Sequence, residues 1–181
     1  MATPPDFTSG QILTAAQMNA VGMWLVKTQI VGTTVASVNV TSAFSADYDN
    51  YKIVYDGGTC STNVSLNLKI GAATTNYQYA FVVNQYNSTA VVGGGSAAAG
   101  SFVEGGRAST VKNNLNVELF GPFLATYTGF RSNSTDYLNS SGFSVHGSGF
   151  LNNTTSYSDF TIAPTSGTIS GGTIRVYGYR N

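Results

Sequence analysis

The side chains that most often carry out catalysis are scarce in this sequence. The scarcity concerns four residues: His146, Cys60, Glu104 and Glu118 are the only histidine, cysteine and glutamates. A Ser-His-Asp site needs a histidine that meets a serine and a carboxylate in space, and many serines could supply the nucleophile. In Ser144-Val145-His146-Gly147 the histidine shares its strand parity with the serine and opposes the valine. We therefore expect His146 on a solvated strand face.

Sequence motifs for hydrolysis are also weak. A nucleophile elbow has the pattern Gly-x-Ser-x-Gly between a strand and a helix. The segment Gly147-Ser148-Gly149 is shorter than that pattern, and its neighbours are strand-like. Glycosidases need two facing carboxylates, and no spacing pairs Glu104 with Glu118. We predict that the protein is not an enzyme; an esterase or glycan hydrolase built on a sandwich is the alternative, and it would depend on His146.

Ligands for metals and cofactors are equally few. Zinc sites use several Cys, His or carboxylate groups, and this chain has one histidine and one cysteine. Asp47-Tyr48-Asp49-Asn50 is the best oxygen cluster for calcium, although adjacent Asp and Asn residues usually form turn hydrogen bonds instead. No glycine loop that cradles phosphate precedes a helix. We predict no metal and no cofactor, and we expect Cys60 to be a packed or half-exposed thiol.

Tyrosine is the residue type best suited to recognition here. The chain has 11 tyrosines, and Tyr127, Tyr137 and Tyr157 lie near turns rich in Asn and Ser. A tyrosine offers a large apolar surface with a polar tip, which suits subunit interfaces and sugar binding. These three are candidate glycan contacts; packing in the core or at an interface is the alternative.

The composition indicates a chain that assembles rather than one that diffuses freely. Apolar residues make up 42% of the sequence, charged residues only 9%, and the net charge is zero; about 25% charged residues is typical. So neutral a surface is best tolerated against further copies or a larger particle. The basic residues are scattered, which argues against nucleic-acid binding, and no apolar run approaches the roughly 20 residues of a membrane span.

The pattern of the elements is that of an all-β protein. Val64, Leu66, Leu68 and Ile70 alternate with polar residues, as in a half-buried antiparallel strand. Similar segments recur between Gly, Asn and Ser clusters, about ten strands in all, which predicts an antiparallel β-sandwich or a barrel. We expect a loop for the Gly93–Gly100 run and a tight bend at Phe120-Gly121-Pro122-Phe123.

The head of the chain differs from the rest. Pro4, Pro5 and Gly10 predict an extended arm, after which Thr14 is a good N-cap for a two-turn helix that Gly22 would stop. A helix this short is marginal alone, so it must be held by contacts. We divide the chain into an attachment segment, residues 1–22, and a β-sandwich, residues 23–181. The residues expected to make the attachment contacts are Phe7, Leu13, Met18, Val21 and Trp24.

Four motifs, in order, resemble those of small virion structural proteins of tailed bacteriophages. The head Phe7-x-x-Gly10-x-x-Leu13-Thr14-Ala15-Ala16-x-Met18-Asn19 is similar to a motif at the start of tail-fibre and other appendage proteins. The segments Tyr48-Asp49-Asn50-Tyr51-Lys52-Ile53 and Leu66-Asn67-Leu68-Lys69-Ile70-Gly71 resemble parts of phage β-sandwich appendages. The last segment, Gly171-Gly172-Thr173-Ile174-Arg175-Val176-Tyr177-Gly178-Tyr179-Arg180, resembles their closing strand.

The resemblance implies a jelly-roll-like sandwich that assembles as a homotrimer on the virion surface. It implies an outward-facing accessory, either a tail, neck or fibre-type appendage or a capsid-decoration (cement) protein, whose partners are the major capsid, neck or tail proteins. MATPPDF lacks the basic and apolar regions of a secretory signal, so we expect synthesis in the host cytoplasm. The alternative function is a carbohydrate-binding module, acting as a lectin that binds a host surface glycan.

Overall fold

The fold was analysed in a computed structural model that describes residues 9, 10, 12, 14, 22–138 and 141–179. Within these residues the structure consists of β-strands, turns and loops, and the strand pairs are antiparallel. The predicted short helix falls mostly on residues 15–21, which lie outside the described residues. Four of the predicted attachment residues also lie outside them: Phe7, Leu13, Met18 and Val21.

Fourteen strands make up the described part of the chain. They are β1 (Trp24–Ile30), β2 (Val38–Val40), β3 (Asn50–Asp56), β4 (Thr59–Cys60), β5 (Val64–Ile70), β6 (Tyr77–Gln85), β7 (Val91–Ala99), β8 (Phe102–Ala108), β9 (Asn114–Phe120), β10 (Thr128–Thr135), β11 (Phe143–Leu151), β12 (Phe160–Pro164), β13 (Ile169–Ser170) and β14 (Thr173–Tyr179). The predicted number of about ten was too low, because it missed β7 and the two-residue strands β4 and β13.

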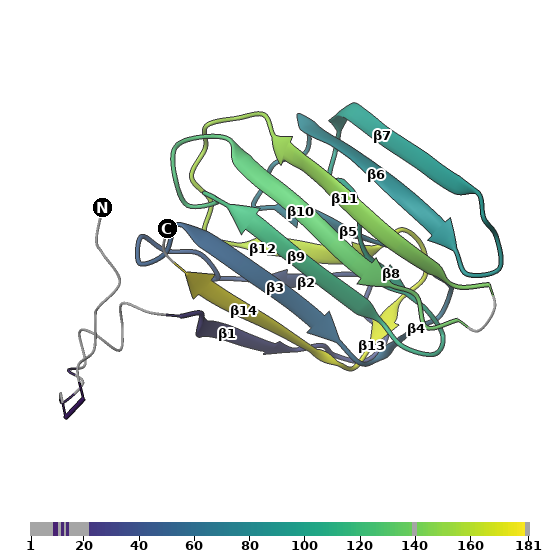
Figure 1. The fold of residues 1–181 in the computed structure, drawn as a ribbon, viewed down its shortest axis with the longest axis horizontal. Helices are drawn as coiled ribbons and strands as arrows, with labels where there is room; N and C mark the ends of the chain where they lie inside the picture. Colours follow the sequence, from purple (N-terminus) through teal and green to yellow (C-terminus); the bar gives the residue numbers. More distant parts are fainter. Residues whose placement is uncertain (1–8, 11, 13, 15–21, 139–140, 180–181) are drawn as a thin grey trace.

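The strands form two layers (Figure 1). The front layer has the order β1-β14-β3-β9-β10-β11-β6-β7, and the back layer has the order β2-β12-β5-β8. The layers are joined where β8 also pairs with β9, at Gly106↔Leu115 and Arg107↔Asn114. Strands β4 and β13 form a separate small sheet at one end. The prediction of an all-β fold with antiparallel sheets in a sandwich-like arrangement is confirmed.

Alternation of side chains explains why these segments become strands with one buried face. In β9, Leu115, Val117 and Leu119 are fully buried, whereas the residues between them are partly exposed. Because β9 pairs with β3 in register, Ile53 of β3 lies opposite Val117 on the same inner face. Burying such side chains provides most of the stabilisation of a sandwich.

Aromatic rings fill the space between the layers. Phe102 of β8 stacks on Phe130 of β10, with ring centroids 4.1 Å apart and planes inclined by 6°. Tyr77 of β6 meets Phe102 edge-on at 4.8 Å. These offset and edge-to-face pairs add to the burial energy of the rings. Cys60 is also buried in this core, as one of the two predictions for its thiol required.

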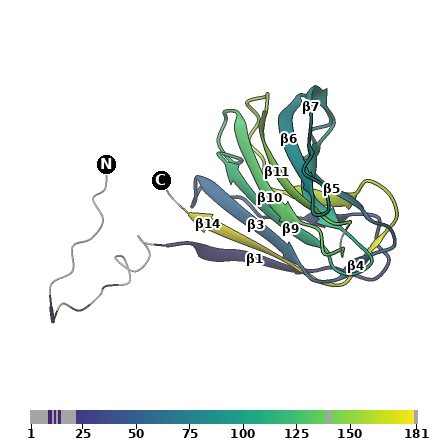
Figure 2. The same cartoon turned by 45° about the vertical axis from the view of Figure 1, so that its right-hand side comes forward.

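The Gly93–Gly100 segment is not a loop, contrary to the prediction. Residues 91–99 form β7, which pairs with β6 from Asn84↔Val91 to Tyr77↔Ala99 and is the last strand of the front layer. Glycine and alanine carry no apolar periodicity that could reveal a strand. Hydrogen bonds to β6 hold the backbone extended instead. Figure 2 shows the β6–β7 hairpin at the opposite side of the layer from β1.

The predicted bend after β9 is confirmed. Gly121 has a φ of +70°, and its carbonyl accepts a hydrogen bond from the Leu124 N–H at 3.1 Å. This backbone conformation favours glycine. The chain then returns as β10, which begins at Thr128 and is longer at its C-terminal end than the segment the sequence indicated.

Candidate functional site

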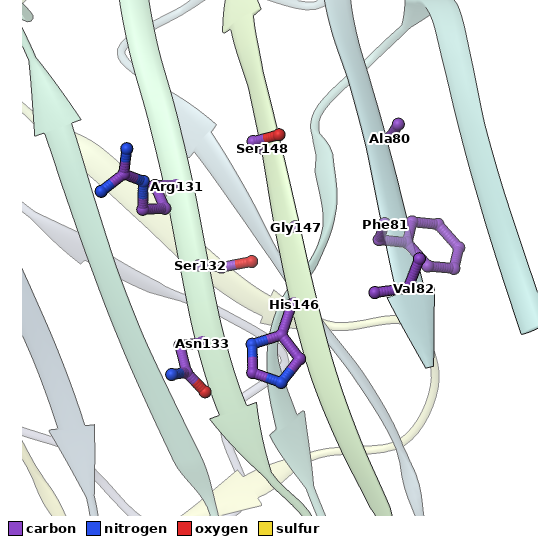
Figure 3. A pocket seen from close by; sticks show the side chains of 9 residues that line it. All are labelled: Ala80, Phe81, Val82, Arg131, Ser132, Asn133, His146, Gly147 and Ser148. Atoms are coloured by element: carbon purple, nitrogen blue, oxygen red, sulfur yellow. The ribbon is translucent and has the colours of Figure 1, made fainter. Parts of the chain in front are cut away.

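The largest hollow on the outward face of the front layer lies over β10, β11 and β6 (Figure 3). It has a volume of about 460 Å³. It is lined by Ala80, Phe81 and Val82 of β6, Arg131, Ser132 and Asn133 of β10, and His146, Gly147 and Ser148 of β11. This size falls within the usual range for ligand pockets, and we treat the hollow as the candidate site.

Strand register places four polar side chains on this face. Asn133 lies opposite His146, and Arg131 lies opposite Ser148, so all four point to the same side of the layer. His146 is exposed there, as its parity predicted. Gly147 lies between the two polar β11 residues, where a Cβ atom would come within 2.8 Å of Ser132 Oγ. The glycine thus leaves the floor of the hollow open.

The chemistry of the hollow is hydrogen bonding. A guanidinium, an amide, an imidazole and a hydroxyl are presented side by side, and all can bind neutral hydroxyl groups or anions. His146 Nε2 lies 3.2 Å from Ser144 Oγ. In the described part of the chain no carboxylate contacts this pair, so the third member of a triad is missing there.

A second hollow of about 220 Å³ continues the first toward β3. It is lined by Lys52, Asn116, Glu118, Arg131, Ser132 and Asn133, the last three of which it shares with the first hollow. Arg131 Nη1 lies 3.8 Å from Glu118 Oε2, and the guanidinium lies 5.9 Å from the centre of the Phe120 ring. Together the two hollows form a polar groove that crosses β3, β9, β10, β11 and β6.

Aromatic rings border the end of this groove. Gly129 pairs with Phe120 on one side and with Phe150 on the other, so both rings lie on the outward face. The missing side chain of Gly129 leaves room for the Phe120 ring, which would lie 3.2 Å from a Cβ atom. The exposed ring of Tyr127 packs against Phe150 at 5.8 Å. The rings and the groove form one continuous strip, which we call the outward strip.

The three tyrosines predicted as glycan contacts do not come together. Tyr127 belongs to the outward strip, but Tyr137 follows the opposite end of β10, where Lys112 Nζ lies 4.7 Å from its ring centre. Tyr157 packs against Gly71 and accepts a hydrogen bond from Asn153 Nδ2 at 2.8 Å. The phenylalanines of the outward strip were missed, because an exposed phenylalanine on a strand has the same pattern as a buried one.

Trp24 is the one predicted attachment residue that the structure describes. It begins β1 and lies opposite Gly178 of β14, at the edge of the front layer. Its side chain is partly buried. The exposed neighbours Met23 and Leu25 extend this apolar edge.

A buried ionic cluster joins β8 to β5 and β10, and the sequence did not reveal it. Arg107 Nη1 donates to Ser65 Oγ at 3.0 Å and to Glu104 Oε1 at 3.3 Å, and its Nη2 donates to Asp136 Oδ2 at 3.3 Å. Ser65 also donates to Glu104. We call Glu104, Arg107 and Asp136 the ionic triad. Two carboxylates on one guanidinium tie three strands together.

The surroundings of the ionic triad are aromatic. The Arg107 guanidinium lies 5.0 Å from the centre of the Phe143 ring, and Tyr86 Oη donates to the Asp136 carbonyl at 2.9 Å. Burial, followed by the charge of Asp136, raises the pKa of Tyr86. Burial, followed by the charge of Glu104, raises the pKa of Tyr79. Because both phenols are held neutral, they add no negative charge beside the carboxylates.

Metal and membrane sites are absent from the described residues. No group of three or more His, Cys, Asp or Glu side chains there could hold a metal ion. Asp47, the first residue of the predicted calcium cluster, is engaged in a turn, where Ser45 Oγ bonds its carboxylate at 3.0 Å. No helix in the described ranges is long and apolar enough to cross a membrane.

Comparison with known proteins found no relative: no family model, no curated protein and no solved structure matches this chain.

Proposed function

We propose that the protein is a structural component of a tailed-phage virion, an outward-facing accessory attached through residues 1–22. The observation that carries this proposal is the polarity of the sandwich. The chain enters at Trp24 and reaches its last strand residues beside it, since Trp24 pairs with Gly178. Residues 1–22 therefore join the sandwich at one edge of the front layer, and β7 lies at the other edge.

This polarity suits an attached subunit. Seven strand spacings separate β1 from β7 in the order of the front layer, about 34 Å at roughly 4.8 Å per spacing. An arm that docks at one edge would leave the outward strip and the β6–β7 hairpin facing away from the particle. The four sequence motifs and the low charge support the same assignment.

The proposal includes the remaining features that the resemblance implies. They are a jelly-roll topology, a homotrimer, a place on the virion surface, and docking to the major capsid, neck or tail protein. It assigns the protein no catalytic activity and no binding to nucleic acid or membranes.

Antibody labelling of purified particles tests this proposal. Antibodies raised against the purified protein should decorate intact particles of the phage that encodes it, and the chain should be found in their protein content in constant ratio to the major capsid protein. Labelling of the shell would make it a decoration subunit, and labelling of the neck, tail or fibres an appendage. A chain that is abundant in the infected cell but missing from washed particles would overturn the proposal.

A carbohydrate-binding module is the second candidate, and the outward strip favours it. Exposed rings of Tyr127 and Phe150 next to Arg131, Asn133 and His146 combine a stacking surface with hydrogen-bond donors. Sugars are bound by such pairs of apolar faces and polar groups.

A glycan array with matched variants tests the second candidate. Wild-type protein should bind specific glycans, and Phe150→Ala should weaken the binding by at least tenfold, because the stacking surface is lost. Tyr137→Ala is the control, since this tyrosine lies outside the outward strip, and it should bind like wild type. A result in which Tyr137→Ala abolishes binding and Phe150→Ala does not would contradict the assignment to this face.

A further inference from the structure

The front layer has two edges, and they differ in how well they are protected from pairing. Strand β1 carries Lys27 and an irregular register between Leu25 and Lys27. Charges and bulges of this kind prevent an edge strand from pairing with another chain. Strand β7 is nine residues long and pairs, among the described strands, only with β6. Its other side presents backbone N–H and C=O groups without a strand partner.

The region around β7 contains no charge at all. Residues 70–103 include no Lys, Arg, Asp, Glu or His, and this segment covers all of β6 and β7. The side chains of Val91 and Val92 are 64% and 62% exposed. Proline is also absent from both strands. A long, uncharged and apolar edge of this kind is a site for strand addition.

Charge and shape both favour a second copy of this chain as the partner. Two identical surfaces repel each other when they carry like charges, and an uncharged edge has no such repulsion. Strand β7 is regular from Val91 to Ser96, because the register shifts only opposite Gln78, between Tyr77 and Tyr79. Within this regular part the large residues come first and the small residues follow.

An antiparallel pair of β7 strands therefore fits itself. A two-fold axis normal to the sheet at Gly93 sets Val91 of one copy opposite Gly95 of the second copy, and Val92 opposite Gly94. Each valine then meets a residue without a side chain, so the two edges approach without steric conflict. A symmetric contact of this type is the commonest in homo-oligomers.

We propose that β7 pairs antiparallel with β7 of a second copy, so that two front layers form one continuous sheet across a two-fold axis. The contact is independent of attachment to a virion, and it would exist equally in a free lectin. A two-fold contact joins copies in pairs, so a homotrimer would have to form through other surfaces.

Cross-linking of the full-length chain tests the two-fold axis. In Gly93→Cys the new thiols of two copies lie near the axis, and a short bismaleimide should join them into a dimer. A Cβ atom at Gly93 has only an ordinary 3.6 Å contact with Phe81 O, so the variant should fold. Val111→Cys is the control, because Val111 is similarly exposed but lies outside β7, and Cys60 is buried in both variants.

The expected yield of cross-linked dimer is at least tenfold higher for Gly93→Cys than for Val111→Cys. Equal yields, or no dimer with Gly93→Cys, would overturn the proposal. Light scattering gives a second measurement: Gly93→Lys places like charges across the axis and should halve the molar mass of the wild-type assembly. A wild-type chain that is monomeric, or whose mass the lysine leaves unchanged, would also overturn it.

Discussion

The backbone of Glu104 has a φ of +60°, a value uncommon for a residue other than glycine. In a regular strand, residues three apart point to opposite faces. The left-handed conformation at Glu104 breaks this alternation within β8, so Glu104 and Arg107 both turn inward and bond. The strain of about 1–3 kcal/mol at such a position is offset by the contacts of the ionic triad.

The charge balance of the ionic triad leads to a prediction for Arg107. Arg107→Met should lower the free energy of unfolding by about 3–5 kcal/mol, because two buried carboxylates lose their counter-charge. Arg131→Met is the matched control: its guanidinium side chain is 68% exposed against 11% for Arg107, and an exposed ion pair contributes about 0–1 kcal/mol. Urea unfolding of both variants measures the difference. Similar losses in the two variants would show that the triad does not stabilise the fold.

At the scale of the elements, the close approach of β11 and β6 depends on glycine. Gly149 of β11 lies opposite Tyr79 of β6, and a Cβ atom there would come within 2.1 Å of Gln78 O. The conflict is with backbone atoms, which cannot rotate away as a side chain can. The two strands must therefore separate if the glycine is replaced.

Gly149→Ala is expected to lower the free energy of unfolding by about 1–3 kcal/mol through overpacking. Gly93→Ala, in the same layer but with an open Cβ position, should change it by less than about 0.5 kcal/mol. Thermal unfolding of both variants makes the comparison. If the two alanines have equal effects, the spacing of β11 and β6 is not set by this glycine.

The elements that the sequence predicted are those with apolar alternation. Val64–Ile70 became β5 and the Thr173–Tyr179 segment became β14, since each has one buried and one solvated face. Strand β7 was missed because neighbouring strands, and not its own side chains, fix its conformation. The polar residues Arg131–Thr135 of β10 were missed for a related reason: Ser132 and Ser134 take inward positions where apolar residues were expected.

The candidate site was predictable only in part. The exposure of His146 followed from parity alone, and Tyr127 was correctly selected as an exposed ring. The outward strip itself depends on which strands become neighbours. Arg131 meets Ser148, and Phe120 meets Phe150 across Gly129, only through pairings between segments far apart in the sequence. Local patterns contain no information about such pairings.

At the scale of the whole molecule, the sandwich has a neutral end and an ionic middle. Residues 70–103 form an uncharged hairpin, whereas the described charged side chains of the front face lie on β3, β9, β10 and β14, among them Lys52, Glu118, Arg131 and Arg175. Association through the hairpin would leave the charged part of the face in contact with solvent. The low overall charge is thus distributed so that self-association and recognition use different parts of one layer.

The pairing of Trp24 with Gly178 means that the described chain enters and leaves the sandwich side by side. A unit connected in this way behaves like a plug on a two-wire lead. It can be exchanged between host proteins, or spliced into the surface loop of another, without separating the strands on either side of the junction. The same sandwich could therefore spread among unrelated attachment segments by recombination, with each new lineage changing the arm and keeping the exposed layer.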